Sequence, residues 1–250
     1  MAKVYIRLAR WGYKFLVAVK NENDTMKALL IIDMQKVSFT PKTPRFNSDD
    51  VIKRINILSD KFRKNGDIVI FIQHNGSKEG FCIPNTEEWE ILSSLEIGKN
   101  DIFISKTAND SFYQTTLKND LIQLGIEEVI ITGCATDFCV DSTVKSALTN
   151  DFNITVISDG HTTADRNYIS AKQVIDYYNW IWNEMTPTKN KIEVIKFDDY
   201  YERMKWKPPP TEAVEMRLCG WKRNWKTRKT RKFFLPNLLS FGLKLNNDKS

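Results

Sequence analysis

Long apolar runs are missing from this sequence, and so are paired cysteines and internal repeats. No hydrophobic run approaches the roughly 20 residues that a helix needs to cross a membrane. The four cysteines, at positions 82, 134, 139 and 219, have neither CxxC spacing nor the density of a secreted disulfide scaffold. These absences argue against a membrane-spanning protein and a disulfide-rich secreted domain, and they favour a cytoplasmic protein with reduced thiols.

Acidic residues are scarce at both ends of the chain, although the net charge of the whole is only +6. Residues 203–250 hold 13 Lys and Arg against 3 Asp and Glu, whereas residues 27–202 hold 19 against 26. We therefore expect three regions: a basic N-terminal extension (1–25), one α/β domain (26–202) and a basic, aromatic, poorly ordered C-terminal tail (203–250). The segment Leu16–Val19 is too short for the apolar part of a signal peptide.

The central domain alternates buried-type strands with amphipathic helices. Strands are predicted at 27–32, 68–73, 102–105, 129–132, 154–158 and 192–195, because each is a short run rich in Val, Ile and Leu. Helices are predicted at about 49–65, 111–124 and 169–185, and from just after Thr136 and Asp137 to Leu148, with a short helical piece at 87–94. This alternation predicts a doubly wound parallel sheet of six strands in the order 3-2-1-4-5-6, with helices on both faces.

The segment 127–148 organises the rest of the chain. Val129 to Thr132 read as a strand that Gly133 ends, and Thr136 and Asp137 are candidates to cap the following helix. Cys139 then falls in the first helical turn, where free backbone N–H groups and the helix dipole favour a thiolate. A free cysteine is also often a small buried hydrophobe, so its position alone leaves both interpretations open.

Two other strands end in a charged residue. Asp33 follows the strand at 27–32 and Lys106 follows the strand at 102–105. Because parallel strands bring their carboxyl ends to one edge of the sheet, we expect Asp33, Lys106 and Cys139 to lie together, where open α/β folds bind ligands.

Three motifs around these residues resemble the isochorismatase-like cysteine hydrolases, over roughly residues 27–200. They are ALLIIDMQ with Asp33, SKTANDSFYQTTL with Lys106 and ITGCATDFCVDSTVKSA with Cys139. The resemblance implies an Asp-Lys-Cys catalytic triad and a cis peptide bond between Cys134 and Ala135. It also implies cleavage of a C–N bond through a thioester on Cys139, with an oxyanion held by backbone N–H groups of that turn.

Rival chemistries have less support in the residues. His74 or His161 could act as the base of a Cys-His pair, but Asp33 already stands in the family's base position; we expect His74 to contact substrate or support the site, and His161 to hold its own loop. The nicotinamidases of this superfamily bind a metal through an Asp-x-His pattern, which is absent at 73–76. We therefore predict no metal and no cofactor. A non-catalytic binding or scaffold protein and a nicotinamidase-like amidase remain the alternatives.

Aromatic residues in the expected edge loops and helices suggest a pocket and an interface. Phe39, His74, Trp89, Phe112 and Tyr113 are candidates to line a substrate pocket, although each could equally pack in the core. The helix at 169–185 carries more aromatic residues than one face can bury, which favours a homo-oligomer. The basic tail could contact nucleic acid or an anionic membrane, but it has no recognised motif, so we favour a tail without that role.

Overall fold

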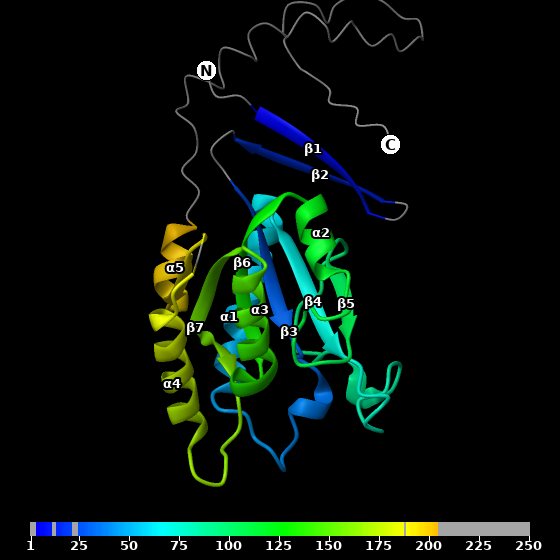
Figure 1. Cartoon of the computed structure of the whole chain (residues 1–250). Coiled ribbons are helices and arrows are strands. Elements are labelled where there is room, and N and C mark those ends of the chain that lie inside the picture. Colours follow the sequence, from blue (N-terminus) through cyan, green and yellow to red (C-terminus); the bar gives the residue numbers. More distant parts are fainter. Residues whose placement is uncertain (1–3, 12–13, 22–24, 188, 205–250) are drawn as a thin grey trace, which may run out of the picture. The chain divides into compact units, whose positions relative to one another are not determined.

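The computed structural model describes residues 4–11, 14–21, 25–187 and 189–204 (Figure 1). Its main sheet has six strands, all parallel, in the order β5-β4-β3-β6-β7-β8. The bounds are β3 (Met26–Ile32), β4 (Ile68–His74), β5 (Ile102–Lys106), β6 (Ile126–Cys134), β7 (Asn153–Thr162) and β8 (Ile192–Ile195). Counted within the domain this order is 3-2-1-4-5-6, so the predicted topology is confirmed.

Helices cover both faces of this sheet, because alternate residues of each buried strand point to opposite sides. On one face Ala28, Leu30 and Ile32 pack in a core shared with α2 (Leu117–Gln123), α3 (Asp141–Thr149) and α4 (Ala171–Glu184). On the other face Leu29 and Ile31 pack against α1 (Ser48–Asn65) and α5 (Phe197–Arg203). Two apolar layers thus hold the central strand β3 on both sides.

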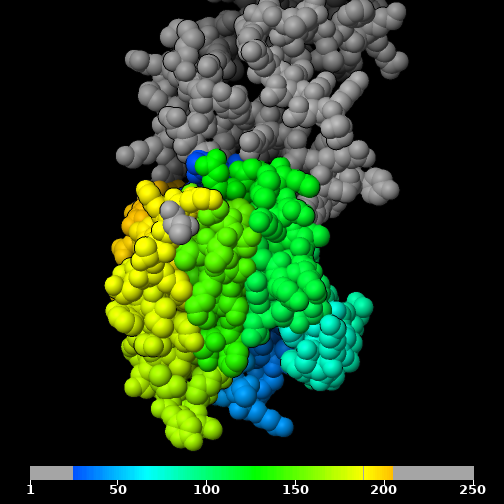
Figure 2. All heavy atoms as spheres, in the orientation of Figure 1, coloured from blue at the N-terminus to red at the C-terminus, as the bar shows by residue number. Residues whose placement is uncertain are grey.

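The loops that follow β3, β4 and β7 leave from the carboxyl edge of the sheet, at the bottom of Figure 1, and Figure 2 shows them protruding there. The loop after β4 contains one 3-10 turn, Glu87–Trp89, which is shorter than the predicted helical piece. Among the described residues no helix is long and apolar enough to cross a membrane.

A separate two-stranded antiparallel sheet lies within the N-terminal extension. β1 (Val4–Trp11) pairs with β2 (Lys14–Asn21) over its whole length. The sequence analysis predicted no strands there, although the alternation of Val4, Ile6 and Leu8 with other residues was a usable signal. The basic tail lies outside the described residues, apart from its first two, Arg203 and Met204.

Several predicted boundaries in the domain were wrong. β7 ends at Thr162 rather than at Ser158, and α3 starts only at Asp141. Helix α2 begins at Leu117 rather than Ser111, because residues before it bond locally: the Phe112 N–H donates to Asp110 and the Thr115 hydroxyl donates to the Ser111 carbonyl. Gly133 does not end its strand but lies inside β6, with a φ of 121°. A Cβ atom there would come within 2.2 Å of the Ile32 carbonyl oxygen, so glycine permits β6 to pass close to the end of β3.

Candidate active site

The structure brings Asp33, Lys106 and Cys139 together at the carboxyl edge of the sheet. Asp33 directly follows β3, Lys106 ends β5, and Cys139 lies in a π-helical turn, Thr136–Val140, after β6. The Lys106 ammonium is 2.6 Å from Asp33 Oδ2, and both side chains shift the pKa of the Cys139 thiol. The juxtaposition expected from the parallel topology is therefore present.

Asp33 is held by its backbone as well as by its side chain. Its φ is 47°, in the left-handed region, and its N–H donates to the Ile72 carbonyl of the neighbouring strand β4 at 2.9 Å. Asp33 as a whole residue is 5% exposed, and the second oxygen of its carboxylate, Oδ1, is buried and receives no hydrogen bond from the described residues. That oxygen is available to accept a proton.

Lys106 is buried in the sheet edge with 1% exposure. Besides Asp33, its ammonium group donates to the Ala108 carbonyl at 2.9 Å. Burial alone lowers the pKa of an amine, but Asp33 and Cys139 outweigh burial here, and the pKa of Lys106 is raised. Lys106 therefore keeps its positive charge beside the carboxylate.

Cys139 is half-buried, and its thiol lies 3.6 Å from the side-chain oxygen of Asn109. Burial and the negative charge of Asp33 raise the pKa of this thiol, and Lys106 offsets only part of the shift. The expectation of a lowered pKa was therefore wrong. A thiol whose pKa is raised above its usual value keeps its proton at neutral pH, and the carboxylate beside this thiol is that of Asp33.

The turn that carries Cys139 begins with the cis peptide bond between Cys134 and Ala135 that the family resemblance implies. The Ala135 carbonyl accepts hydrogen bonds from Phe138 N–H and Val140 N–H, both at 3.1 Å. This wide turn presents Cys139 before α3 starts at Asp141.

Thr136 and Asp137 do not cap the helix, contrary to prediction. Asp137 instead forms a two-point ion pair with Arg166, at 2.8 and 3.0 Å, and accepts a hydrogen bond from Thr163. These bonds lower the pKa of Asp137 although burial opposes them, and the Arg166 guanidinium lies 5.1 Å from the centre of the Phe138 ring. The loop after β7 thus holds the middle of the turn.

Gln35 is a residue of the site region that the sequence analysis did not single out. Its buried amide donates to the His74 carbonyl, to the Trp89 carbonyl and to the Cys82 sulfur, and its oxygen accepts from the His74 N–H at 2.7 Å. It joins the segment after Asp33 to the long loop after β4. In the sequence, the only indication that Gln35 belongs to the site region was its position two residues after Asp33, at the end of an apolar run.

The five pocket candidates separate into different environments. Phe112 is buried and stacks on Phe152, so it belongs to the core and its assignment to a pocket wall was wrong. Tyr113 is 55% exposed, and Phe39 is half-buried against the α1 side of the core. His74 and Trp89 are half-buried, and His74 Nδ1 and Trp89 Nε1 are buried without a hydrogen-bond partner among the described residues.

His74 lies next to the charged pair, opposite Lys106 in the β4–β5 register. Burial and Lys106 lower the pKa of its imidazole, although Asp33 acts in the other direction. The lowered pKa favours the uncharged form of this imidazole at neutral pH. Within the described ranges no cluster of three His, Cys, Asp or Glu side chains could hold a metal ion.

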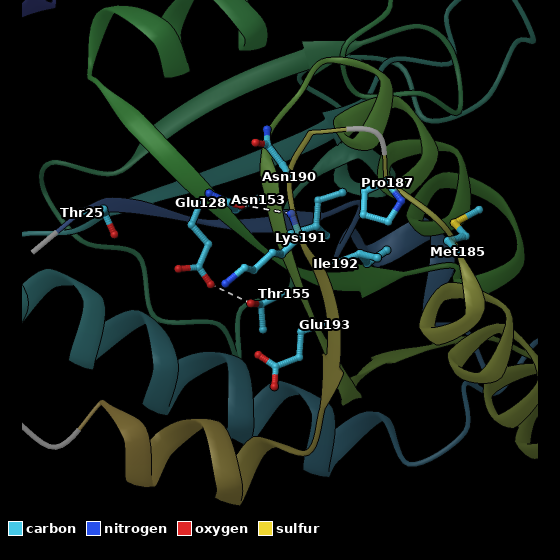
Figure 3. Close-up of a pocket in the computed structure, with 11 residues that line it drawn as sticks. Thr25, Glu128, Asn153, Thr155, Met185, Pro187, Asn190, Lys191, Ile192 and Glu193 are labelled. Carbon is cyan, nitrogen blue, oxygen red and sulfur yellow. Dashed lines mark hydrogen bonds between the residues drawn. The ribbon is translucent and has the colours of Figure 1, made fainter.

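A cavity of about 670 Å³ lies at the opposite edge of the sheet (Figure 3). Its lining includes Glu128, Asn153 and Ile192, which lie at or near the first residues of β6, β7 and β8. The Thr155 hydroxyl donates to Glu128 there at 2.7 Å. Because Asp33, Lys106 and Cys139 lie at the carboxyl edge, this cavity is separate from their site.

Residues 27–189 match the family model of the isochorismatase domain, which is more than half of the chain. The chain belongs to the isochorismatase family. A relative in this family, the streptothricin hydrolase of Streptomyces noursei, is 27% identical over 140 residues, 56% of this chain and 56% of that protein. The chain thus aligns with little more than half the length of that relative.

Two further relatives cover more of the fold. An Arabidopsis thaliana protein named "probable inactive nicotinamidase" is 32% identical over 68% of this chain and 90% of its own length. The crystal structure of a cysteine hydrolase from Pseudomonas syringae superposes with a TM-score of 0.64 at 18% identity, over 80% of this chain and 97% of that chain. At this identity the second likeness shows the fold alone.

Proposed function

We propose that this isochorismatase-family protein is a hydrolase that cleaves the C–N bond of a small amide or ureido compound, without a metal. The observation that carries the proposal is the buried Lys106–Asp33 pair, 2.6 Å between charged atoms, next to a thiol whose proton must be removed. The streptothricin hydrolase among its relatives supports a hydrolytic activity for this chain.

In the first half-reaction Asp33 accepts the Cys139 proton and the thiolate attacks the substrate carbonyl carbon. Backbone N–H groups of Cys139 and its turn hold the oxyanion of the tetrahedral intermediate. Asp33 then gives its proton to the departing nitrogen, the C–N bond breaks, and the acyl group stays on Cys139 as a thioester.

In the second half-reaction Asp33 takes a proton from water, and the hydroxide attacks the thioester carbonyl. The C–S bond breaks, the proton returns to Cys139 and the carboxylic or carbamic acid leaves. Lys106 keeps Asp33 in place throughout, and it offsets part of the negative charge as the thiolate forms.

A non-catalytic binding protein is the second candidate, because one relative is named a "probable inactive nicotinamidase". The absence of an Asp-x-His pattern at 73–76 argues against a nicotinamidase-like activity for this chain.

We also infer a homo-oligomer. Trp182 is fully buried, but Tyr177 and Trp180 on the same helix are 53% and 60% exposed, and exposed aromatic residues favour protein interfaces.

The experiment is a screen of amides and ureido compounds for release of amine or ammonia, with a chelator present in half of the reactions. We expect turnover of at least one compound, unaffected by the chelator, and a quenched sample with the acyl mass on the Cys139 peptide. Turnover that the chelator abolishes would contradict the metal-free mechanism. Compounds that bind without turnover would favour the non-catalytic candidate.

A further inference from the structure

His161 lies in β7 directly beside the turn that carries Cys139. Its partner in the β6 register is Gly133, and Thr162 is opposite Cys134. The side chain is 1% exposed. The prediction that His161 holds its own loop was wrong, because its two ring nitrogens bond to Thr136 and Asn179 in two other segments of the chain.

The hydrogen bonds determine which nitrogen of His161 carries the proton. The Asn179 amide nitrogen donates to the Ser158 carbonyl at 2.9 Å, so the Asn179 oxygen faces His161 Nε2 at 3.0 Å. Nε2 must therefore carry the hydrogen and donate it. Nδ1 then has no hydrogen, so it accepts a hydrogen bond from the Thr136 hydroxyl at 2.9 Å. Burial lowers the pKa of His161 to about 4, so the ring is neutral at neutral pH.

His161 and Trp182 hold the two ends of the Cys139 turn. Thr136, its first residue, is fully buried and bonds to His161. Asp141, the residue that follows the turn, accepts the Trp182 indole N–H at 3.0 Å. Trp182 in turn packs edge-on against the His161 ring, 5.2 Å between centres. Helix α4 and β7 together thus fix the start and the end of the segment that contains Cys139.

We propose that His161 is a positioning residue: through the Thr136 hydroxyl it holds the turn so that the Cys139 thiol faces Asp33 and Lys106. This inference rests on the proposed function. Displacing a catalytic group by about 1 Å can slow a reaction by about 100-fold. Loss of the Thr136–His161 hydrogen bond at the start of the turn would let Cys139 shift by such a distance, so we expect it to have a large effect on the rate.

The test removes the hydroxyl and leaves the imidazole, because replacing a buried histidine can prevent folding. Thr136→Val removes the donor with little change of shape, and Thr136→Ser keeps the donor and serves as the rescue. The matched control is Thr155→Val, which removes another buried threonine hydroxyl, bonded to Glu128 at the far edge of the sheet. Melting temperature, kcat and KM are measured for all three.

We expect Thr136→Val to lower kcat by about 100-fold with KM within about threefold, and Thr136→Ser to restore most of the rate. Thr155→Val should lose a similar amount of melting temperature and keep its kcat. Equal kcat in Thr136→Val and wild type would overturn the proposal. So would a loss of kcat in Thr155→Val as large as in Thr136→Val, because the effect would then follow stability alone.

Two readouts need no substrate, so they separate this proposal from the proposed function. The chain has only two histidines, and nitrogen NMR with a His74→Gln variant for assignment should show His161 neutral with its proton on Nε2. The alkylation rate of Cys139 by iodoacetamide should change several-fold in Thr136→Val and not in Thr155→Val. A proton on Nδ1, or alkylation equal in all variants, would overturn the positioning role even if the protein hydrolyses no compound tested.

Discussion

Replacing Lys106 by Met should destabilise the protein strongly, because it leaves the Asp33 carboxylate buried without its partner. The Lys106 side chain is 0% exposed and that of Asp33 is 8% exposed. Breaking a buried ion pair by removing one partner costs about 3–5 kcal/mol, and Met fills nearly the volume of Lys, so a cavity adds little. We expect a loss of about 3–5 kcal/mol in the free energy of unfolding.

The assay is urea unfolding at neutral pH, with two further variants. Lys172→Met removes an ion pair of the same 2.6 Å length whose side chains are 64% and 60% exposed, and it should cost less than about 0.5 kcal/mol. The double variant with Asp33→Asn removes both charges, so its cost should fall below the sum of the single costs by about 2–3 kcal/mol.

The result that would refute this reasoning is a Lys106→Met protein as stable as Lys172→Met. Additive costs in the double variant would also refute it, since they would mean that Asp33 and Lys106 do not interact. Either result would remove the basis for assigning Lys106 a role in holding Asp33.

Two other predictions concern the charges around Cys139. Asp33→Asn should abolish turnover yet speed iodoacetamide alkylation of Cys139 at pH 8, because Asp33 raises the pKa of the thiol; slower alkylation than in wild type would contradict this. Arg166→Gln should make the free energy of unfolding depend less steeply on pH in the acid range. The pKa of Asp137 lies below its usual value of about 4, so the ion pair stabilises the fold above that value and loses its effect as pH falls through the folded-state pKa. Unfolding followed from pH 6 to pH 3 checks this, and parallel curves for the two proteins would contradict it.

The sheet and the position of the site could be predicted because both depend on local patterns. Each buried strand is a run of Val, Ile and Leu, and the parallel topology alone brings the residues after β3 and β5 to the edge where Cys139 lies. The cis peptide bond after Cys134 came from the family resemblance, because nothing in residue spacing indicates it.

The details of the site depended on partners far away in sequence. Thr136 and Asp137 have the residue types of helix caps, but His161 and Arg166, 25 and 29 residues later, bond to them instead. The pKa of Cys139 was predicted in the wrong direction, because the helix terminus was considered without the burial and the Asp33 charge that the fold brings to the thiol. The turn is also π-helical, which residue types alone do not predict.

The central claim, that Cys139 is the nucleophile, is tested most directly by Cys139→Ala assayed on the compound that the wild-type protein hydrolyses. Cys139→Ala leaves the Lys106–Asp33 ion pair in place and removes a half-buried thiol whose hydrogen bond to Asn109 is long, at 3.6 Å, so the melting temperature should stay within a few degrees of wild type. We predict that turnover falls by about 1000-fold or more and that no acyl adduct forms. A folded Cys139→Ala protein that keeps a tenth or more of the wild-type turnover would contradict the account.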